Sequence, residues 1–150
     1  MNISRVKQGA KITYYNGFYM ILIGIYYIFL VGFNMGVNFS SLSQLWGFFT
    51  RYNANIAFLF YLFNILIGII LISQGITFIY LSDFIIKRKE KITWVILFIS
   101  GLITWAGLLT ISIFLKNLYL ITFSFIGWLS FIIGMLIPIQ YYVEKNYKEY

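Results

Sequence analysis

Four uninterrupted apolar runs constrain the fold of this chain more than any other feature of its sequence. The runs cover residues 17–33, 54–81, 92–115 and 118–143, and none of them contains a charged residue. Each run reaches or exceeds the roughly 17–25 residues that a helix needs to cross the hydrocarbon core of a bilayer. Strands of a membrane barrel would be shorter and would alternate in polarity, so each run is predicted to form a transmembrane α-helix.

The composition agrees with a membrane protein. Hydrophobic residues make up 61% of the chain and charged residues 10%, whereas a soluble domain is about half apolar and about a quarter charged. A globular domain of 150 residues could not bury that much apolar surface. We therefore predict one all-α integral membrane domain over residues 1–150, an antiparallel bundle of four transmembrane helices at about 13–33, 54–81, 92–115 and 118–143.

The link between the first two runs has a pattern of its own. The apolar residues of this link recur at helical spacing, and they are Leu42, Leu45, Trp46, Phe49 and Tyr52. The segment from Ser41 to Gln44 has the sequence of a capping box, which would start a helix at Ser41. We predict a short interfacial amphipathic helix over about 41–50, with Trp46 as an aromatic anchor in the headgroup region. A lid or a docking surface for a partner is the functional alternative.

Lysine and arginine residues set the predicted direction of threading. The side that carries both termini would hold nine of them, which are Arg5, Lys7, Lys11, Lys87, Arg88, Lys89, Lys91, Lys145 and Lys148. The opposite side would hold two, Arg51 and Lys116. Positive charge is enriched in the cytoplasmic loops of membrane proteins. The sequence therefore predicts a multi-pass protein of the cell membrane with cytoplasmic N- and C-termini.

Lys87, Arg88, Lys89 and Lys91 lie together in the link between the second and third runs. Four cations in one short turn are expected to attract the headgroups of anionic lipids. A nucleic-acid interface is the less favoured interpretation, because basic clusters that flank a transmembrane helix usually mark its cytoplasmic end. We expect membrane lipids among the partners of this protein and no nucleic acid.

Each run also carries a stripe of small and polar residues at alternating steps of four and three. In chain order, the four stripes are Gly17, Met20, Gly24, Tyr27 and Val31; Ala57, Tyr61, Asn64, Gly68, Leu71, Gly75, Phe78 and Ser82; Thr93, Leu97, Ser100, Thr104, Gly107 and Ile111; and Phe123, Gly127, Ser130, Gly134, Ile137 and Tyr141. Helices in lipid associate through close approach at such residues, so the stripes predict the seam of a left-handed bundle. Pro138 predicts a kink in the last helix, because its ring presses on the carbonyl of Gly134.

No catalytic chemistry is recognisable in the sequence. It contains no histidine and no cysteine, which leaves out thiol nucleophiles, imidazole bases and the usual zinc, haem and iron–sulfur ligands. The four acidic residues, Asp83, Glu90, Glu144 and Glu149, lie outside the apolar runs. The sequence also has no phosphate-binding glycine loop and no metal-ligating motif. We predict no enzyme activity and no cofactor, and transport driven by a membrane-embedded glutamate is disfavoured.

The candidate contacts with a partner or ligand are neutral, and they are Tyr26, Tyr27, Trp46, Asn64, Gln74, Trp105, Trp128 and Gln140. The amides of Asn64 and Gln74 need hydrogen-bond partners inside the membrane. Asn64 is expected to serve the bundle seam, and Gln74 to face another subunit. A hydrophobic ligand could be held among four aromatic residues of this set, Tyr26, Tyr27, Trp105 and Trp128. A buried tyrosine, however, more often bonds a neighbouring helix.

The preferred function is that of a non-catalytic integral membrane subunit, or an assembly or accessory factor, of a larger membrane protein complex. One alternative is a passive channel or small transporter built by self-association, whose pore Gln74, Thr77, Ser112 and Gln140 would have to line. The other alternative is a four-helix membrane protein that binds a lipid or a quinone. The expected partners are membrane lipids and other membrane protein subunits, in a hetero- or homo-oligomer.

Overall fold

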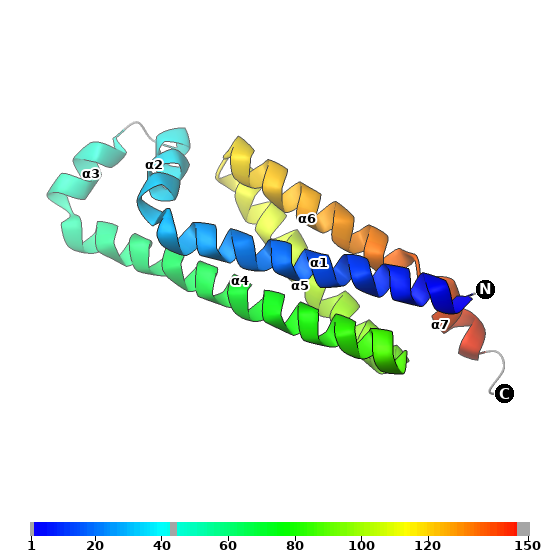
Figure 1. Ribbon diagram of the computed structural model, residues 1–150. Helices are drawn as coiled ribbons and strands as arrows, with labels where there is room; N and C mark the ends of the chain where they lie inside the picture. The colour runs from blue at the N-terminus through cyan, green and yellow to red at the C-terminus, as the bar shows by residue number, and fades with distance from the viewer. Residues whose placement is uncertain (1, 43–44, 147–150) are drawn as a thin grey trace.

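The structure is a computed structural model that describes residues 2–42 and 45–146 (Figure 1). Its elements are the helices α1 (Asn2–Phe29), α2 (Val31–Leu42), α3 (Trp46–Tyr52), α4 (Ala54–Arg88), α5 (Lys91–Phe114), α6 (Leu118–Leu136) and α7 (Ile139–Asn146). Four of them, α1, α4, α5 and α6, are long and apolar enough to cross a membrane. No strand occurs among the described residues. The predicted all-α fold with four membrane-spanning helices is confirmed.

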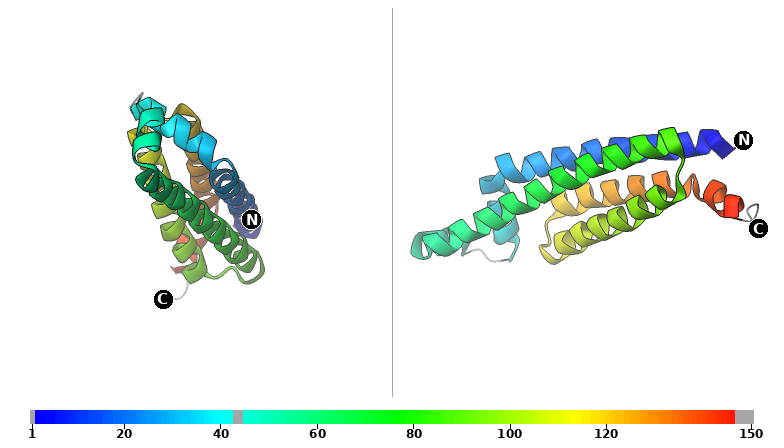
Figure 2. Two further views of the ribbon diagram at one scale, coloured as in Figure 1. Left: turned by 90° about the vertical axis from the view of Figure 1, so that its left-hand side faces the viewer. Right: turned by 90° about the horizontal axis from the view of Figure 1, so that it is seen from below.

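The four long helices form two antiparallel pairs. Helices α1 and α4 lie side by side over most of the length of α1, and α5 and α6 form the second pair (Figures 1 and 2). The second pair joins the first mainly through α6, which packs against α1. The described ends of the chain lie at one end of the bundle, which we call the termini side (Figure 1). Helices α2 and α3 lie at the other end, the α2–α3 side.

Helix α4 is longer than its predicted span of 54–81. It continues to Arg88 and ends at Lys89, whose backbone adopts a left-handed φ of 53° and donates its N–H to the Ile85 carbonyl. At 1.5 Å per residue, its 35 residues extend over roughly 52 Å, whereas the hydrocarbon core is about 30 Å thick. The helix therefore extends past the hydrocarbon core, and the cations in its last turn complement the negative end of the helix dipole.

Helix α1 begins earlier than predicted and ends sooner. The predicted bounds were about 13–33, but the helix already starts at Asn2. The additional N-terminal turns are ordered by packing, since Val6 and Ala10 are buried in the hydrophobic core. At its other end α1 stops at Phe29, and the chain bends into α2.

The bend between α1 and α2 is centred on Leu30. Leu30 donates its N–H to the Tyr26 carbonyl, but in the described part of the chain no bond joins the Val31 N–H to the Tyr27 carbonyl. The Tyr27 carbonyl instead accepts a hydrogen bond from the side-chain amide of Asn64 at 3.3 Å. A side chain from α4 thus replaces the helical bond that the bend removes.

Two helices occupy the region of the predicted interfacial helix at about 41–50. Ser41 lies in the last turn of α2, so the prediction that a helix begins there is wrong, because the preceding residues continue as a helix whose asparagines bond the bundle. Ser43 and Gln44 of the predicted capping box lie outside the described residues, as do Lys148 and Glu149. Helix α3 begins at Trp46, whose ring packs edge-on against Phe60 of α4 with the ring centroids 6.4 Å apart.

The predicted last span of 118–143 is divided at Pro138. Helix α6 ends at Leu136 and α7 begins at Ile139, so the chain is interrupted where a kink within one span was predicted. The Pro138 ring packs against α1 at Gly9, where an added Cβ would lie 2.7 Å from the proline Cδ. Glycine at this position therefore makes the room that the ring requires.

The predicted stripe on α4 is the buried face of that helix. Its buried members are Ala57, Asn64, Gly68, Leu71, Gly75, Phe78 and Ser82, with Ile85 added. The predicted stripe on α1 is also correct for Gly17, Met20, Gly24 and Tyr27, which are buried. On α5 the buried face is displaced, because after Leu97 it contains Gly101, Trp105 and Ser112 rather than Ser100, Thr104, Gly107 and Ile111. On α6, Gly127 and Gly134 are buried as predicted, whereas Phe123 is exposed.

Candidate functional site

A buried asparagine joins three of the spanning helices at one point. Asn16 of α1 donates from Nδ2 to the Gly127 carbonyl and to the Ser130 hydroxyl of α6, both at 2.8 Å. Its Oδ1 accepts the indole N–H of Trp105 on α5 at 2.9 Å. Every strong polar group of this junction is therefore paired inside the bundle. No spacing pattern in the sequence could have identified Asn16, because its partners lie 89 to 114 residues further along the chain.

A second polar cluster lies near the α2–α3 side and consists of four buried asparagines. Asn117 donates to Asn38 at 2.6 Å, Asn38 to Asn34 at 3.3 Å, and Asn34 to Asn64 at 3.1 Å. Asn64 completes the series with its bond to the Tyr27 carbonyl. All amides donate in the same direction, so the bonds polarise one another. We call these residues the asparagine chain; it ties α2 to α4, to the bend after α1 and to the start of α6.

Part of the asparagine chain could have been predicted. Asn34 and Asn38 are four residues apart and therefore lie on one face of a helix. Asn117 serves as the N-cap of α6, where its Oδ1 accepts the backbone N–H groups of Tyr119 and Leu120. The expectation that Asn64 serves the bundle seam agrees with its burial and its bonds.

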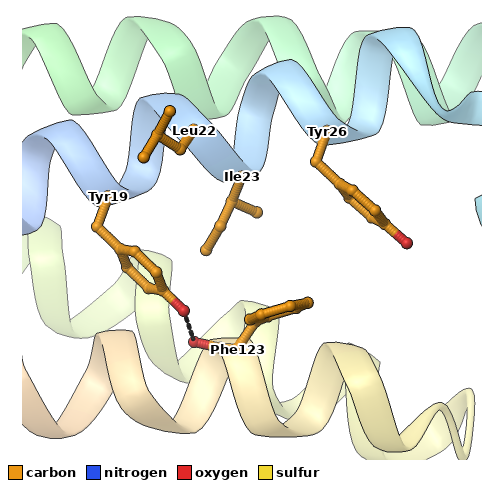
Figure 3. Close-up of a pocket in the computed structure, with 5 residues that line it drawn as sticks. All are labelled: Tyr19, Leu22, Ile23, Tyr26 and Phe123. Atoms are coloured by element: carbon orange, nitrogen blue, oxygen red, sulfur yellow. Dashed lines mark hydrogen bonds between the residues drawn. The ribbon is translucent and has the colours of Figure 1, made fainter.

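An apolar pocket lies between α1 and α6 (Figure 3). It has a volume of about 190 Å³ and is lined by Tyr19, Leu22, Ile23 and Tyr26 of α1 and by Phe123 of α6. The Tyr19 hydroxyl donates to the Phe123 carbonyl at 3.0 Å, which closes one end of the pocket. The Tyr26 hydroxyl lies at the other end, nearer to α2 (Figure 3), and has no hydrogen-bond partner among the described residues.

The aromatic residues predicted to hold a hydrophobic ligand do not converge on this pocket. Tyr26 lines it, but Tyr27 and Trp105 are buried in the core at 5% and 0% exposure. The Trp105 ring stacks on Tyr19 with centroids 6.0 Å apart, so it supports the back of the pocket instead of lining it. Trp128 is half-buried and packs against Phe125 on its own helix.

The two glutamines among the candidates bond within the chain. Gln74 Oε1 accepts a hydrogen bond from the Ser100 hydroxyl of α5 at 3.3 Å. The Gln74 side chain therefore has a hydrogen-bond partner within its own chain, whereas from the sequence we expected it to face another subunit. Gln140 Oε1 accepts from the Arg5 guanidinium and so links the start of α1 to α7.

The basic cluster Lys87, Arg88, Lys89 and Lys91 forms the turn between α4 and α5 on the termini side. Lys87 forms an ion pair with Asp83 at 2.6 Å, and the Arg88 guanidinium lies 4.9 Å above the Phe84 ring. Lys89 occupies the left-handed cap position and Lys91 is the first residue of α5. The side chain of Lys87 is 70% exposed, so its pairing with Asp83 contributes little to stability.

The polar side chains of the Asn16 junction, the asparagine chain and the pocket are all neutral. The part of the chain that the structure describes contains no group of three or more His, Cys, Asp or Glu residues that could hold a metal ion. No protein-family model matches the chain, and no curated protein or solved structure is significantly similar to it.

Proposed function

We propose that this protein is a non-catalytic subunit, or an assembly factor, of a larger membrane protein complex in the cell membrane. The observation that carries the proposal is the internal pairing of its buried polar side chains. Asn16, Trp105 and the asparagine chain use their polar groups on one another. Thr13 bonds Ser82 at 2.8 Å, and Ser112 bonds Ser124 at 3.2 Å. Buried groups that satisfy one another stabilise the bundle and are not directed at a substrate.

The same pairing supports a subunit role over a self-associated pore. Of the four residues that a pore would need, Gln74 is bonded to Ser100 and Gln140 to Arg5. Thr77 returns its hydroxyl to the Ser73 carbonyl one turn earlier, and Ser112 does the same to Leu108. A pore requires polar groups that face its axis. These hydroxyls and the two amide oxygens are already bonded within one chain.

We assign the lateral binding surface to α4. One face of this helix packs on α1, and the opposite face exposes large apolar side chains that include Leu59, Phe63, Leu66, Ile70 and Ile76. In lipid, such a face gains nothing from burying apolar area alone, so a partner helix would have to bind it through complementary packing. The length of α4 gives a partner helix contact over the full hydrocarbon thickness.

Site-specific photocrosslinking in native membranes tests this assignment. A photoreactive phenylalanine at Leu66 or Ile70 of α4 is expected to give discrete protein adducts, whose partner is identified by mass spectrometry. The matched control carries the same group at Ile103, which is exposed on α5 and is expected to react mainly with lipid. Lipid adducts alone at all three positions, together with a monomer after purification in mild detergent, would refute the subunit role.

The proposed orientation has a direct test, because the chain contains no native cysteine. Single cysteines at Lys7→Cys and Lys116→Cys report the two ends of the bundle without further engineering. We expect a membrane-impermeant maleimide to label Lys116→Cys in intact cells and Lys7→Cys after permeabilisation. The reverse pattern would place the termini outside the cytoplasm.

A further inference from the structure

We propose that the pocket between α1 and α6 binds one acyl chain of an ester-linked membrane phospholipid, whose ester carbonyl accepts a hydrogen bond from the Tyr26 hydroxyl. The site belongs to the leaflet on the α2–α3 side. This inference is independent of the proposed subunit role, since it concerns α1 and α6 and not the exposed face of α4.

The shape of the pocket fits a chain. Its lining residues on α1 run from Tyr19 to Tyr26, which is seven residues or roughly 10 Å along the helix axis. Phe123 lies opposite, on α6, so the space is a slot between the two helices that runs along α1 (Figure 3). An alkyl chain in a bilayer lies along this direction.

The chemistry of the walls excludes a polar occupant over most of the length. Leu22 and Ile23 form the middle of the slot, and the polar atom at its deep end, the Tyr19 hydroxyl, is already donated to the Phe123 carbonyl. Behind the slot, Trp105 stacks on Tyr19 and is held by Asn16. The deep end is therefore an apolar surface whose polar groups are already bonded within the chain.

The Tyr26 hydroxyl supplies the polar contact at the outer end. Tyr26 lies three residues before α1 ends at Phe29, close to the boundary between hydrocarbon and headgroups, where tyrosine is enriched in membrane proteins. Its hydroxyl has no hydrogen-bond partner among the described residues, and an unmade bond is costly in an apolar environment. A glycerolipid carries its ester carbonyls at this depth, directly above its acyl chains.

The experiment uses the whole protein in mild detergent with a phosphatidylethanolamine that carries a diazirine on one acyl chain. At low lipid concentration we expect saturable labelling that maps to residues 19–26 and to Phe123. Leu22→Trp fills the slot from a side chain that is 63% exposed, so it should abolish saturable labelling without loss of the fold. Ile103→Trp, at 65% exposure on α5, is the matched control and should leave labelling unchanged.

A second comparison tests the hydrogen bond. Tyr26→Phe should weaken binding of the ester-linked lipid by about threefold to tenfold, the effect of one net hydrogen bond. An ether-linked analogue lacks the carbonyl, so wild type and Tyr26→Phe should bind it equally. Labelling that never saturates, or that Leu22→Trp leaves intact, overturns the pocket. Equal binding of the ester-linked lipid by wild type and Tyr26→Phe overturns the hydrogen bond. Neither result bears on protein adducts formed by α4, which test the subunit role separately.

Discussion

Between α1 and α4 glycines face glycines, whereas between α5 and α6 the two packed glycines, Gly101 and Gly127, each face an aromatic ring. A Cβ added at Gly24 would lie 2.7 Å from the Gly68 carbonyl oxygen, which is backbone. A Cβ added at Gly101 would instead clash with the ring of Phe131, which is a side chain. The same residue type thus brings two backbones together in one half of the bundle and opens a hole for a ring in the other.

This difference determines how each helix pair can accommodate a larger side chain at its packed glycines. The two close contacts of the first half, Gly17 with Gly75 and Gly24 with Gly68, are seven residues apart on both helices, so they recur on the same faces of both helices and fix their register. The second half is filled by stacked rings that extend to the termini side. Side chains can be exchanged for smaller ones, but a backbone cannot, so compensation is expected in the second half alone.

The largest effect is expected where backbone meets backbone. Gly24→Ala should destabilise the protein by about 3 kcal/mol, because α1 and α4 must separate along their whole contact. The measurement is the midpoint of unfolding in mild detergent followed by far-UV circular dichroism. The control is Gly107→Ala on α5, where nothing lies within 4 Å of an added Cβ; its stability should be unchanged or raised slightly. Equal effects of the two variants would contradict the backbone contact.

A smaller and reversible effect is expected at the ring contact. Gly101→Ala should cost about 2 kcal/mol, since the buried Phe131 ring must leave its rotamer. Phe131→Leu makes room, so the double variant Gly101→Ala, Phe131→Leu should be more stable than the sum of the two single changes predicts. The double-mutant cycle is measured by the same unfolding transition. Strict additivity would show that the ring does not occupy the hole at Gly101.

The junction between the halves comes next in size. Asn16→Leu removes three hydrogen bonds and leaves the Trp105 indole N–H without its acceptor. Interhelical hydrogen bonds in membranes contribute about 0.6 kcal/mol each on average, so a loss of about 1.8 kcal/mol is expected for the three. The two halves should also separate more readily, which limited proteolysis would report. A variant as stable as wild type would show that packing alone joins the halves.

The sequence predicted the first half well and the second half poorly, and the reason is physical. The α4 stripe repeats small residues in register with those of α1, and a regular period can be read from one chain. Trp105 opposite Gly127 follows no period, because it depends on the size of one side chain matching a gap on another helix. That is why the predicted stripe on α5 followed the small polar residues Ser100 and Thr104.

The candidate site was predicted only in part for the same reason. Tyr26 could be singled out because a tyrosine inside an apolar run needs an explanation. The bend at Leu30 could not, since neither glycine nor proline occupies that position and the bond of Asn64 to the Tyr27 carbonyl is long-range. Without the bend, Asn34 and Asn38 seemed to lie in a link, and the asparagine chain was not anticipated.

The smallest effect is expected at the end of the ring-packed half, where two buried polar groups, the Trp94 indole N–H and the Tyr142 hydroxyl, have no partner among the described residues. Tyr142 of α7 stacks on Trp94 of α5 with centroids 5.1 Å apart, and its hydroxyl is buried without a partner among the described residues. Tyr142→Phe removes that group and keeps the ring. At neutral pH the variant should therefore be as stable as wild type or more stable, by up to about 1 kcal/mol. A loss of stability would reveal a partner for the hydroxyl.

Unfolding at alkaline pH isolates the contribution of the Tyr142 hydroxyl to stability from that of the ring packing. Burial, and secondly the neighbouring Tyr141, raise the pKa of Tyr142 from its ordinary value of 10.0 to about 12. Between these two values the unfolded chain has lost the phenolic proton while the folded chain still holds it. Stability must then fall as the pH rises from 10 towards 12, and it is fully present below pH 10. Tyr142→Phe should lose less stability than wild type over this interval in the same unfolding assay, because phenylalanine has no proton to release. Parallel pH profiles for the two proteins would mean that the stack of Tyr142 on Trp94 is open to solvent. The ring-packed half would then be less tightly packed at this end than the α1–α4 pair is at its glycine contacts.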